Sequence, residues 1–352
     1  MEKLSGASKV WRFLLNIFTL GLLFFLIVSF HLTQEVMPAA GYGEEELVVV
    51  IPQGASSAEV AEILQEEGLV RNQLAFRLYT NYMGYAPRLQ AGKYQLSPGM
   101  TLKEIVDKLA QGEVMVDYVR VTIPEGLHKE QVAQRLENYD VTTAESFLGC
   151  AREESFDFWF LQEREIDNSL EGYLFPDTYQ IKIEWEDKEI IELLLKRFDE
   201  VFNDSFQERV EELGLTVHEV VTLASIIERE ARVKEEQPLI SAVFHRRLEK
   251  DILLQSCATV QYALGEVKPV LTYQDLEVES PYNTYINYGL PPGPIASPGK
   301  EALEASLYPA DTEYLYFVLK GDGSGEHYFS KTLEEHLKYQ RKANQERLER
   351  EN

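Results

Sequence analysis

Residues 216–231 read TVHEVVTLASIIEREA, and this stretch predicts a helix that holds one carboxyl group in an apolar setting. It begins with a capping box, in which Thr216 and Glu219 would each bind a backbone N–H group at the start of the helix. The run 220–227 that follows has only two hydroxyl side chains among apolar ones, and it ends directly at Glu228. A carboxyl group in that position needs a physical explanation.

Glu228 has two interpretations from this helix alone. On a period of about 3.6 residues its face is shared by Val221, Ala224 and Ser225, whose small side chains leave room beside it. An apolar wall disfavours the charged form of a carboxyl group and raises its pKa, which keeps a glutamate protonated as a general acid near neutral pH. Alternatively, Glu228 pairs with Arg232, four residues further on, as an exposed ion pair.

The segments around this helix combine helices with strands. Helices are expected at 188–212, 216–234 and 238–250, strands at 314–319 and 327–329, and a surface helix at 331–352. Because the two kinds of element alternate irregularly, the pattern favours an α+β fold for a larger domain at 118–345.

A weak internal repeat precedes this domain. The sequence IPQG at 51–54 recurs as IPEG at 123–126, and apolar residues follow each copy at the same spacing. In each copy a strand-like stretch ends at Pro-x-Gly, and a short amphipathic helix follows. This unit makes 47–115 look like a LysM-type module, a small β/α fold that binds N-acetylglucosamine-containing glycans in many envelope proteins. An ordinary packing unit is the alternative.

The chain starts with a stretch that predicts a transmembrane helix. Residues 13–32 run for 20 positions without Asp, Glu, Lys or Arg, which is enough to cross a bilayer core of roughly 30 Å. Lys and Arg residues precede this stretch and Glu residues follow it, so the positive-inside rule places 1–12 in the cytoplasm and the rest outside the cell membrane. A cleaved signal peptide is the alternative, although its apolar region is shorter. Residues 33–46 are expected to form a linker.

Composition excludes several classes of function. A net charge of −25 disfavours nucleic acids, whose partners usually present a basic patch. The cysteines Cys150 and Cys257 lack the spacing of a disulfide framework or a metal site, and the six histidines contain no H-E-x-x-H motif. The sequence therefore predicts neither a metal nor a cofactor.

Seven motifs follow one another along the chain. They are EGYLFPDTY at 171–179, LASIIEREA at 223–231, LQSCATVQY at 254–262, YNTY at 282–285, GLPPGPIASPG at 289–299, YLYFV at 314–318 and HYF at 327–329. In this order they resemble the endolytic murein transglycosylase family, also called YceG-like, over about 47–340. Several long motifs in the right order are far more specific than one glutamate in one helix.

The resemblance implies internal cleavage of peptidoglycan glycan strands, between N-acetylmuramic acid and N-acetylglucosamine, which leaves a 1,6-anhydro end. The essential glutamate of the family falls on Glu228. One carboxyl group suffices because the 6-hydroxyl of the sugar is the nucleophile, whereas ordinary glycosidases need two carboxyl groups. The family also implies a single N-terminal anchor and action beside membrane-bound synthases such as penicillin-binding proteins. Cys257 departs from the family, in which many members are expected to have an aspartate.

Substrate contacts are expected from the motifs that flank Glu228. The candidate binding residues are Gln255, Tyr282, Asn283 and Tyr285. Their amide and hydroxyl groups are candidates for hydrogen bonds to sugar hydroxyl or N-acetyl groups, and the ring of Tyr282 is a candidate for stacking on a sugar face. Asn283 could equally cap a turn.

Two other classes of function stay open at this point. A catalytically silent glycan-binding scaffold of the cell-wall synthesis machinery would need the LysM-like unit and the anchor, but not Glu228. A glycoside hydrolase would pair Glu228 with a second carboxyl group from Glu171, Asp177 or Asp275. Glu171 and Asp177 are also candidates for a supporting role, in which they would orient Glu228 or only cap a helix.

Overall fold

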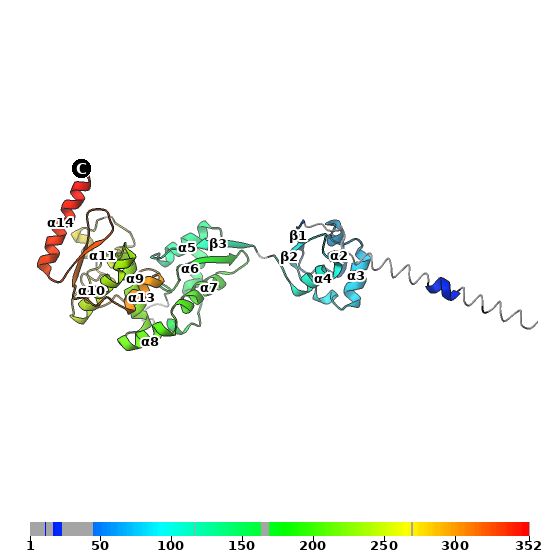
Figure 1. Ribbon diagram of the computed structural model, residues 1–352, viewed down its shortest axis with the longest axis horizontal. Helices are drawn as coiled ribbons and strands as arrows, with labels where there is room; N and C mark the ends of the chain where they lie inside the picture. The colour runs from blue at the N-terminus through cyan, green and yellow to red at the C-terminus, as the bar shows by residue number, and fades with distance from the viewer. Residues whose placement is uncertain are drawn as a thin grey trace, which may run out of the picture. The chain divides into compact units, whose positions relative to one another are not determined.

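The computed structural model describes residues 11, 17–22, 45–115, 117–162, 169–268 and 270–351. The chain divides into two compact units, 1–117 and 118–352 (Figure 1). Of the predicted transmembrane stretch 13–32, only residues 17–22 are described, and they are helical; the rest of that stretch and most of the predicted linker 33–46 lie outside the described residues. Among the residues that are described, no helix is long and apolar enough to span a membrane.

The first unit contains a two-stranded antiparallel sheet and helices. Its elements in chain order are β1 (Leu47–Ile51), α2 (Ser57–Glu66), α3 (Gln73–Tyr82), η1 (Ala86–Arg88), β2 (Gly92–Leu96) and α4 (Leu102–Gln111), with β1 paired to β2. Both α2 and α4 begin with a capping box, which satisfies backbone N–H groups at the helix start. The buried faces of the helices and alternate strand residues share one apolar core, with Val60, Leu64 and Tyr94 among its members.

The second unit starts with another antiparallel pair. Its first elements are β3 (Tyr118–Thr122), α5 (Lys129–Asn138), α6 (Ala144–Glu153), η2 (Trp159–Leu161), β4 (Thr178–Lys182), α7 (Asp187–Val201), α8 (Asp204–Leu213) and α9 (Val217–Glu230), with β3 paired to β4. An aromatic cluster of Phe160, Tyr173, Phe198 and Phe202 lies in the core of this half. These large rings bury much apolar surface where α7 follows the sheet.

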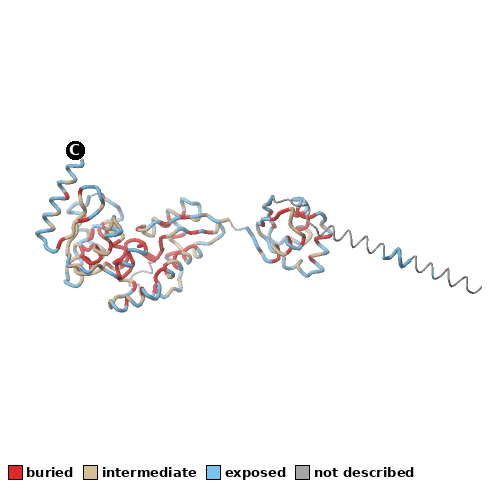
Figure 2. Tube along the Cα trace, in the orientation of Figure 1, coloured by how far each residue is buried: buried red, intermediate tan, exposed pale blue. Residues whose placement is uncertain are grey.

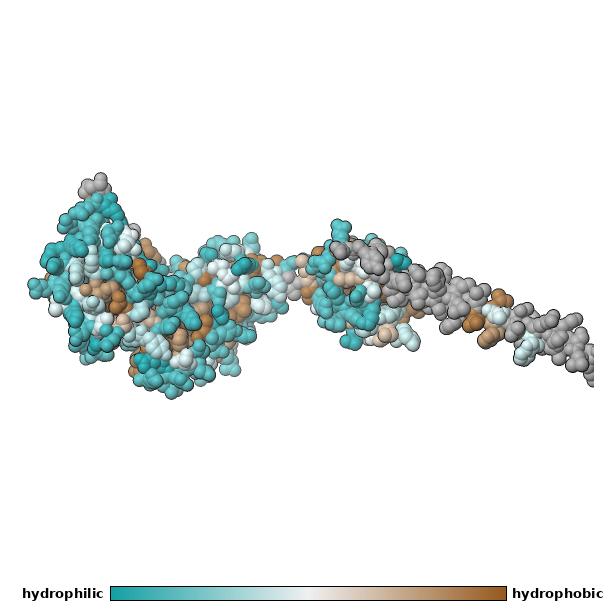
Figure 3. All heavy atoms as spheres, in the orientation of Figure 1, coloured by the Kyte–Doolittle hydropathy of each residue, from teal (hydrophilic) through white to brown (hydrophobic). Residues whose placement is uncertain are grey.

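The rest of the second unit folds around α9. The remaining elements are η3 (Lys234–Glu236), α10 (Gln237–Glu249), α11 (Cys257–Leu264), α12 (Tyr273–Leu276), α13 (Lys300–Leu307), β5 (Tyr316–Leu319), β6 (His327–Ser330) and α14 (Leu333–Glu351), with β5 antiparallel to β6. Helices α8, α10, α11 and α13 all pack against α9. Residues 220–227 of α9 are therefore buried, whereas α14 is largely exposed (Figure 2). Hydrophilic residues cover most of the visible face of this unit (Figure 3).

The mixture of helices and small sheets confirms the α+β prediction, and two helix boundaries differ from it. The predicted helix 188–212 is two helices. The first ends at Val201, and Asn203 caps the second, where its Oδ1 atom accepts the N–H groups of Ser205 and Phe206. The helix predicted at 216–234 has the expected capping box, but it ends at Glu230, and Ala231 is already extended.

Candidate functional site

Glu228 lies on the last turn of α9, and its side chain is partly buried. Its Oε2 atom accepts a hydrogen bond of 3.1 Å from the backbone N–H of Gly299, the residue that precedes α13. Burial raises the pKa of Glu228, and the hydrogen bond from Gly299 opposes part of that rise. The carboxyl group is therefore held by the backbone of a buried turn, in place of the exposed ion pair with Arg232.

The space that the small residues Ala224 and Ser225 leave beside Glu228 is filled by another segment of the chain, residues 293–299. Ser225 accepts a hydrogen bond of 3.0 Å from the N–H of Ile295 and donates one of 2.7 Å to the carbonyl of Thr222. Residues 293–299 are buried over their whole length. The proline-rich loop thus crosses α9 and brings Gly299 to the carboxyl group.

Two contacts from the motif 171–179 and from α9 hold this loop. His218 donates through Nε2 to the carbonyl of Pro292 at 2.8 Å, which leaves Nδ1 to accept from the hydroxyl of Tyr173 at 2.9 Å. A Cβ atom on Gly172 would lie 2.4 Å from Cβ of Pro294. Only glycine permits that approach, so the two motifs pack together against the same helix.

Charged side chains surround the carboxyl group of Glu228. Lys234 Nζ lies 2.8 Å from Glu125 Oε2 and 3.5 Å from Glu301 Oε2. The two acidic neighbours raise the pKa of Glu228 further, and Lys234 lowers it. Neither Glu125 nor Lys234 was singled out from the sequence.

Two glycines let these groups come together. Gly126 is buried at φ +75°, and a Cβ atom there would lie 3.7 Å from both Glu228 Cγ and Arg229 Cδ. At Gly299, a Cβ atom would lie 2.3 Å from Glu125 Oε1, so a side chain would displace the carboxylate of Glu125. The turn 123–126 and the turn before α13 therefore enclose Glu228 from two directions.

The two residues after Glu228 contact other segments. Arg229 donates through Nη1 to the carbonyl of Gly126 at 3.0 Å. Glu230 accepts the N–H of Ala258 at 3.3 Å and the hydroxyl of Ser256, so it caps the start of α11. Successive helix residues point about 100° apart, so the three residues 228–230 contact three different segments. These are the turn before α13, the turn 123–126 and the start of α11.

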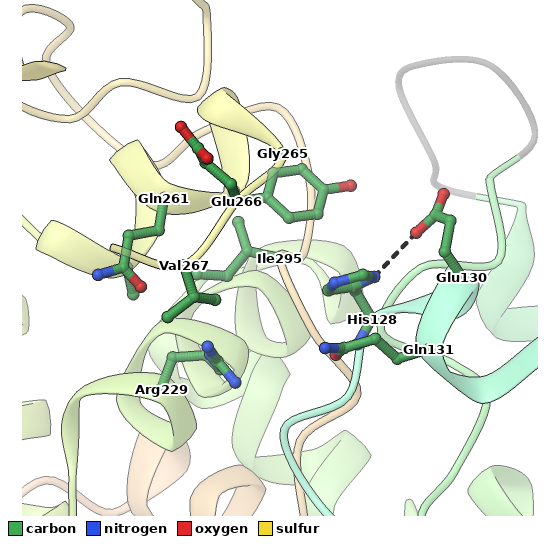
Figure 4. Close-up of a pocket in the computed structure, with 11 residues that line it drawn as sticks. His128, Glu130, Gln131, Arg229, Gln261, Gly265, Glu266, Val267 and Ile295 are labelled. Carbon is green, nitrogen blue, oxygen red and sulfur yellow. Dashed lines mark hydrogen bonds and ion pairs between the residues drawn. The ribbon is translucent and has the colours of Figure 1, made fainter. Parts of the chain in front are cut away.

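A pocket of about 540 Å³ opens beside Arg229. The start of α5, the end of α9, α11 with the turn after it, and the proline-rich loop form its walls. The lining residues are His128, Glu130, Gln131, Arg229, Ala258, Gln261, Tyr262, Gly265, Glu266, Val267 and Ile295. In Figure 4, Gln261 and Val267 face His128 and Gln131 across the pocket, and Arg229 lies at its base.

Tyr262 and the buried carboxyl group of Glu171 connect this pocket to the core. The hydroxyl of Tyr262 lies 3.4 Å from Glu171 Oε2, and its ring packs on Tyr282 with centroids 4.9 Å apart. The backbone N–H of Lys129, at the start of α5, donates to both carboxyl oxygens of Glu171 at 3.1 and 3.3 Å. Burial and then the charge of Glu130 raise the pKa of Glu171 to about 7.

Gln255 and Tyr285 line a different pocket, of about 410 Å³, next to β5 and β6. The backbone of Gln255 is left-handed at φ +49°, and its Oε1 atom accepts from Arg247 at 3.3 Å. The hydroxyl of Tyr285 lies 3.2 Å from the sulfur of Cys257. Glu230 also lines this pocket, so both pockets reach the end of α9.

Three predicted candidates have structural partners away from Glu228. The side-chain amide of Asn283 donates to the carbonyls of Leu276 and Val278, both at 2.9 Å, and thereby holds its own loop. Asp177 pairs with Arg197 at 2.6 Å. Asp275 pairs with a lysine and caps α12, and these contacts lower its pKa to about 2.

The structure therefore divides the predicted residues into separate groups and adds new ones. Glu228 lies with Gly299 and the charged side chains of Glu125, Lys234 and Glu301. Tyr282 packs against the first pocket through Tyr262, whereas Gln255 and Tyr285 line the second. The residues that sequence reasoning missed are Glu125, Arg229, Lys234, Tyr262 and Glu301. One signal was present, because Glu125 replaces the Gln53 of the first IPxG copy.

The arrangement offers one partly buried carboxyl group with a raised pKa, and the two residues that follow it, Arg229 and Glu230, each line a pocket. Such a group can donate a proton and later take one back. Within the described ranges, no group of three or more His, Cys, Asp or Glu side chains is placed to hold a metal ion.

Comparisons with known proteins agree with this picture. A model of the YceG-like family matches residues 49–342. A protein of Bacillus subtilis named endolytic murein transglycosylase is 36% identical over 304 residues, which is 83% of each chain. A protein of the same name from Streptococcus pneumoniae is 31% identical over 87% of this chain, and the match spans 60% of the length of that protein.

A solved structure extends the likeness to the fold. The crystal structure of a yceG-like protein from Listeria monocytogenes is 37% identical and superposes with a TM-score of 0.57. The match covers 84% of this chain and 99% of the other. The range 49–342 of the family model includes parts of both compact units and the position of Glu228.

Proposed function

The chain belongs to the YceG-like family, and from this premise we propose that it is an endolytic peptidoglycan lytic transglycosylase, a lyase that acts on glycan strands. The observation that carries the proposal is the carboxyl group of Glu228, which is partly buried, raised in pKa and bound by the N–H of Gly299. Its relatives from Bacillus and Streptococcus bear the corresponding name.

In the proposed reaction Glu228 is the catalytic residue. Its protonated carboxyl group donates a proton to the glycosidic oxygen between N-acetylmuramic acid and N-acetylglucosamine as the C1–O bond breaks. The resulting carboxylate then takes the proton from the 6-hydroxyl of the muramic residue, whose oxygen bonds to C1 and closes the 1,6-anhydro ring. Glu228 returns to its starting state, and no water is consumed.

The environment of Glu228 supports this use of a single carboxyl group. Burial and the nearby charges of Glu125 and Glu301 keep a larger fraction of it protonated near neutral pH. Intramolecular attack by the 6-hydroxyl supplies the nucleophile by proximity. Glu171 and Asp177 have other partners, in Lys129 and Arg197, and this speaks against a second carboxyl group in the reaction.

Gln255, Tyr282 and Tyr285 are proposed to contact the glycan strand. The pocket next to Glu230 supports this role for Gln255 and Tyr285, which line it. The ring of Tyr282 lies against Tyr262, which lines the other pocket. Asn283 is proposed to act indirectly, because its amide binds the backbone of its own loop.

The proposed organisation has a membrane anchor at 13–32, a LysM-like glycan-binding unit at 47–115 and a catalytic domain at 118–345. The charge asymmetry around the 20-residue apolar stretch supports a single pass with a cytoplasmic N-terminus. The order β1, α2, α3, β2 supports the LysM-like assignment. An enzyme anchored in this way would act on new strands beside synthases such as penicillin-binding proteins.

Product chemistry tests the proposed reaction. Purified glycan strands are digested, and the fragment ends are identified by mass. The expected products carry anhydro ends, which are lighter than reducing ends by one water. Reducing ends would mean a hydrolase, and no cleavage would mean a glycan-binding scaffold.

A variant tests the role of Glu228. Glu228→Gln keeps the size of the side chain and its hydrogen bond from Gly299, but it has no proton to transfer, so cleavage is expected to be abolished. Glu235→Gln, an exposed neighbour in η3, is the matched control and is expected to retain full activity. Full activity of the Glu228→Gln variant would contradict the assignment of Glu228 as the catalytic residue.

A further inference from the structure

Among the residues that the structure describes, Arg229 lines the pocket of about 540 Å³ without a carboxylate partner. The two acidic residues of this pocket each have a partner: Glu130 shares a hydrogen bond of 3.0 Å with Nδ1 of His128, and Glu266 forms an ion pair of 3.1 Å with Lys268. Arg229 donates to the carbonyl of Gly126, and it makes no ion pair with any residue that the structure describes. A guanidinium group has five N–H donors in a planar fork that fits a carboxylate. Arg229 therefore presents to the pocket a guanidinium group whose shape fits a carboxylate.

The rest of the lining fits a polar ligand with an amide and a ring. Gln131 and Gln261 lie on opposite sides of the pocket (Figure 4). Gln131 Oε1 accepts the N–H of His128 and Gln261 Nε2 donates to the carbonyl of Lys268, so Gln131 still offers its amide NH₂ group and Gln261 its amide oxygen. The ring of Tyr262 is held by Tyr282 on one side and by Glu171 at its hydroxyl, so it is a rigid surface. A volume of about 540 Å³ lies within the usual range for a small-molecule site of about 300–1,000 Å³.

Arg229, which lines the pocket, and Glu228 share one neighbour in Gly126. The side chains of Glu228 and Arg229 both lie against Gly126, at 3.7 Å from where a Cβ atom would be. In peptidoglycan, the stem peptide is attached through a lactyl group to the same muramic ring whose C1 atom would react. A muramic residue placed at Glu228 must therefore bring its peptide to the surroundings of Gly126.

We propose that this pocket binds the stem peptide of the muramic residue, and that Arg229 binds a peptide carboxylate. This inference rests on the proposed function, and it deepens it by naming the part of the substrate that selects the cleavage site. Arg229 is then a specificity-determining residue that distinguishes strands with acidic peptides from strands without them.

The test compares three forms of the same purified strands. One form keeps its stem peptides, one has had them removed by an amidase, and one has had their carboxylates converted to amides. The wild-type protein, Arg229→Gln and Arg229→Lys are assayed for kcat/KM on each form. Arg232→Gln is the matched control, because Arg232 is an exposed arginine three positions away that does not line the pocket.

The wild-type protein is expected to cleave peptide-bearing strands about 10- to 100-fold better than the other two forms, as a charged hydrogen bond allows. Arg229→Gln is expected to lose that preference, so its kcat/KM falls far more on peptide-bearing strands than on the other two forms. Arg229→Lys should keep part of the preference, and Arg232→Gln all of it. Equal slowing of Arg229→Gln on all three forms, or a wild type without preference, overturns the inference.

A binding measurement separates this inference from the proposed function. N-acetylmuramyl-L-alanyl-D-glutamate and its amidated form are titrated calorimetrically into the Glu228→Gln variant, with and without Arg229→Gln. Binding that needs both the free carboxylate and Arg229 supports the pocket even if the wild-type protein cleaves no strand. Equal binding of the two ligands, or binding by neither, rejects the pocket even if cleavage is observed.

Discussion

The two IPxG turns of the chain have nearly the same local sequence and different surroundings. Residues 51–54 and 123–126 both follow a short strand, and their glycines have φ values of +79° and +75°. Gly54 is exposed, and a Cβ atom there would meet nothing within 4 Å. Gly126 is buried against Glu228 and Arg229. The same turn is thus a surface connection in one unit and a wall of the candidate site in the other.

The helices after the two turns are capped in different ways. Helix α2 begins with its own capping box, in which the exposed Glu59 accepts the N–H of Ser56 at 2.7 Å. Helix α5 has a local capping box too, in which Gln131 accepts the N–H of His128, but it also receives a carboxyl group from a distant motif, because Glu171 accepts the N–H of Lys129. Hydrogen bonding lowers the pKa of Glu59, whereas burial raises the pKa of Glu171. The carboxyl groups that cap these two helix starts therefore have pKa shifts of opposite sign, because only Glu171 is buried.

The largest expected effect contrasts these two carboxyl groups. Glu171 has its pKa raised from 4.5 to about 7, so the folded state disfavours its ionisation and loses stability as pH rises through that interval. Glu171→Gln is expected to remove this dependence and to be more stable than the wild type above pH 7 by about 2–3 kcal/mol. Urea unfolding at a series of pH values measures it.

Glu59→Gln is the opposite control. Its lowered pKa gives stability that is present above pH 4.5 and is lost as pH falls through the folded pKa, so this variant should be less stable at neutral pH and equal to the wild type in acid. If Glu171→Gln and Glu59→Gln change the free energy of unfolding at neutral pH in the same direction, the expected difference between the two carboxyl groups is wrong.

The next effect concerns the third residue of each turn. Glu125→Gln removes a negative charge that raises the pKa of Glu228, so less of Glu228 is protonated at neutral pH and the basic limb of the pH–rate profile moves to lower pH. A loss of roughly tenfold in kcat at neutral pH is expected. Gln53→Ala, at the corresponding exposed position, should leave the profile unchanged. A basic limb that moves upward would contradict the assigned role of Glu125.

A smaller effect is expected at Gly299. In Gly299→Ala the new methyl group would displace the flexible side chain of Glu125, from which a Cβ atom would be 2.3 Å away. Activity should fall several-fold, by less than in Glu125→Gln, while the free energy of unfolding changes by about 1 kcal/mol or less. Gly149→Ala, at a helix position with nothing within 4 Å, serves as the control. If Gly299→Ala unfolds the protein, the turn is structural and not a support for Glu125.

The smallest effect compares the two glycines themselves. Gly54→Ala and Gly126→Ala each place a side chain at positive φ, which costs about 1 kcal/mol. Similar losses of stability are therefore expected, as measured by thermal unfolding, but only Gly126→Ala should also reduce cleavage. Equal effects on cleavage would remove the functional difference between the turns.

Much of the site depended on contacts that no local pattern contains. The helix with Glu228 at its end was predictable, because its capping box and apolar run are local signals. The filling of the space beside Ala224 and Ser225 was not, because the loop that occupies it comes from residues 293–299. For the same reason the buried position of Glu171, and the separation of Gln255 from Tyr282, appear only in the folded chain.

The sequence by itself determined the elements of this protein: the capped helices, the Pro-x-Gly turns, the α+β class and, through its ordered motifs, the family. Each of these depends on neighbours within a few residues or on motif order. Only the tertiary structure decided that Glu125, Glu228 and Gly299 meet while Gln53 stays at the surface. The physical reason is that burial and charge at a side chain are set by whatever packs against it, and here that comes from distant segments.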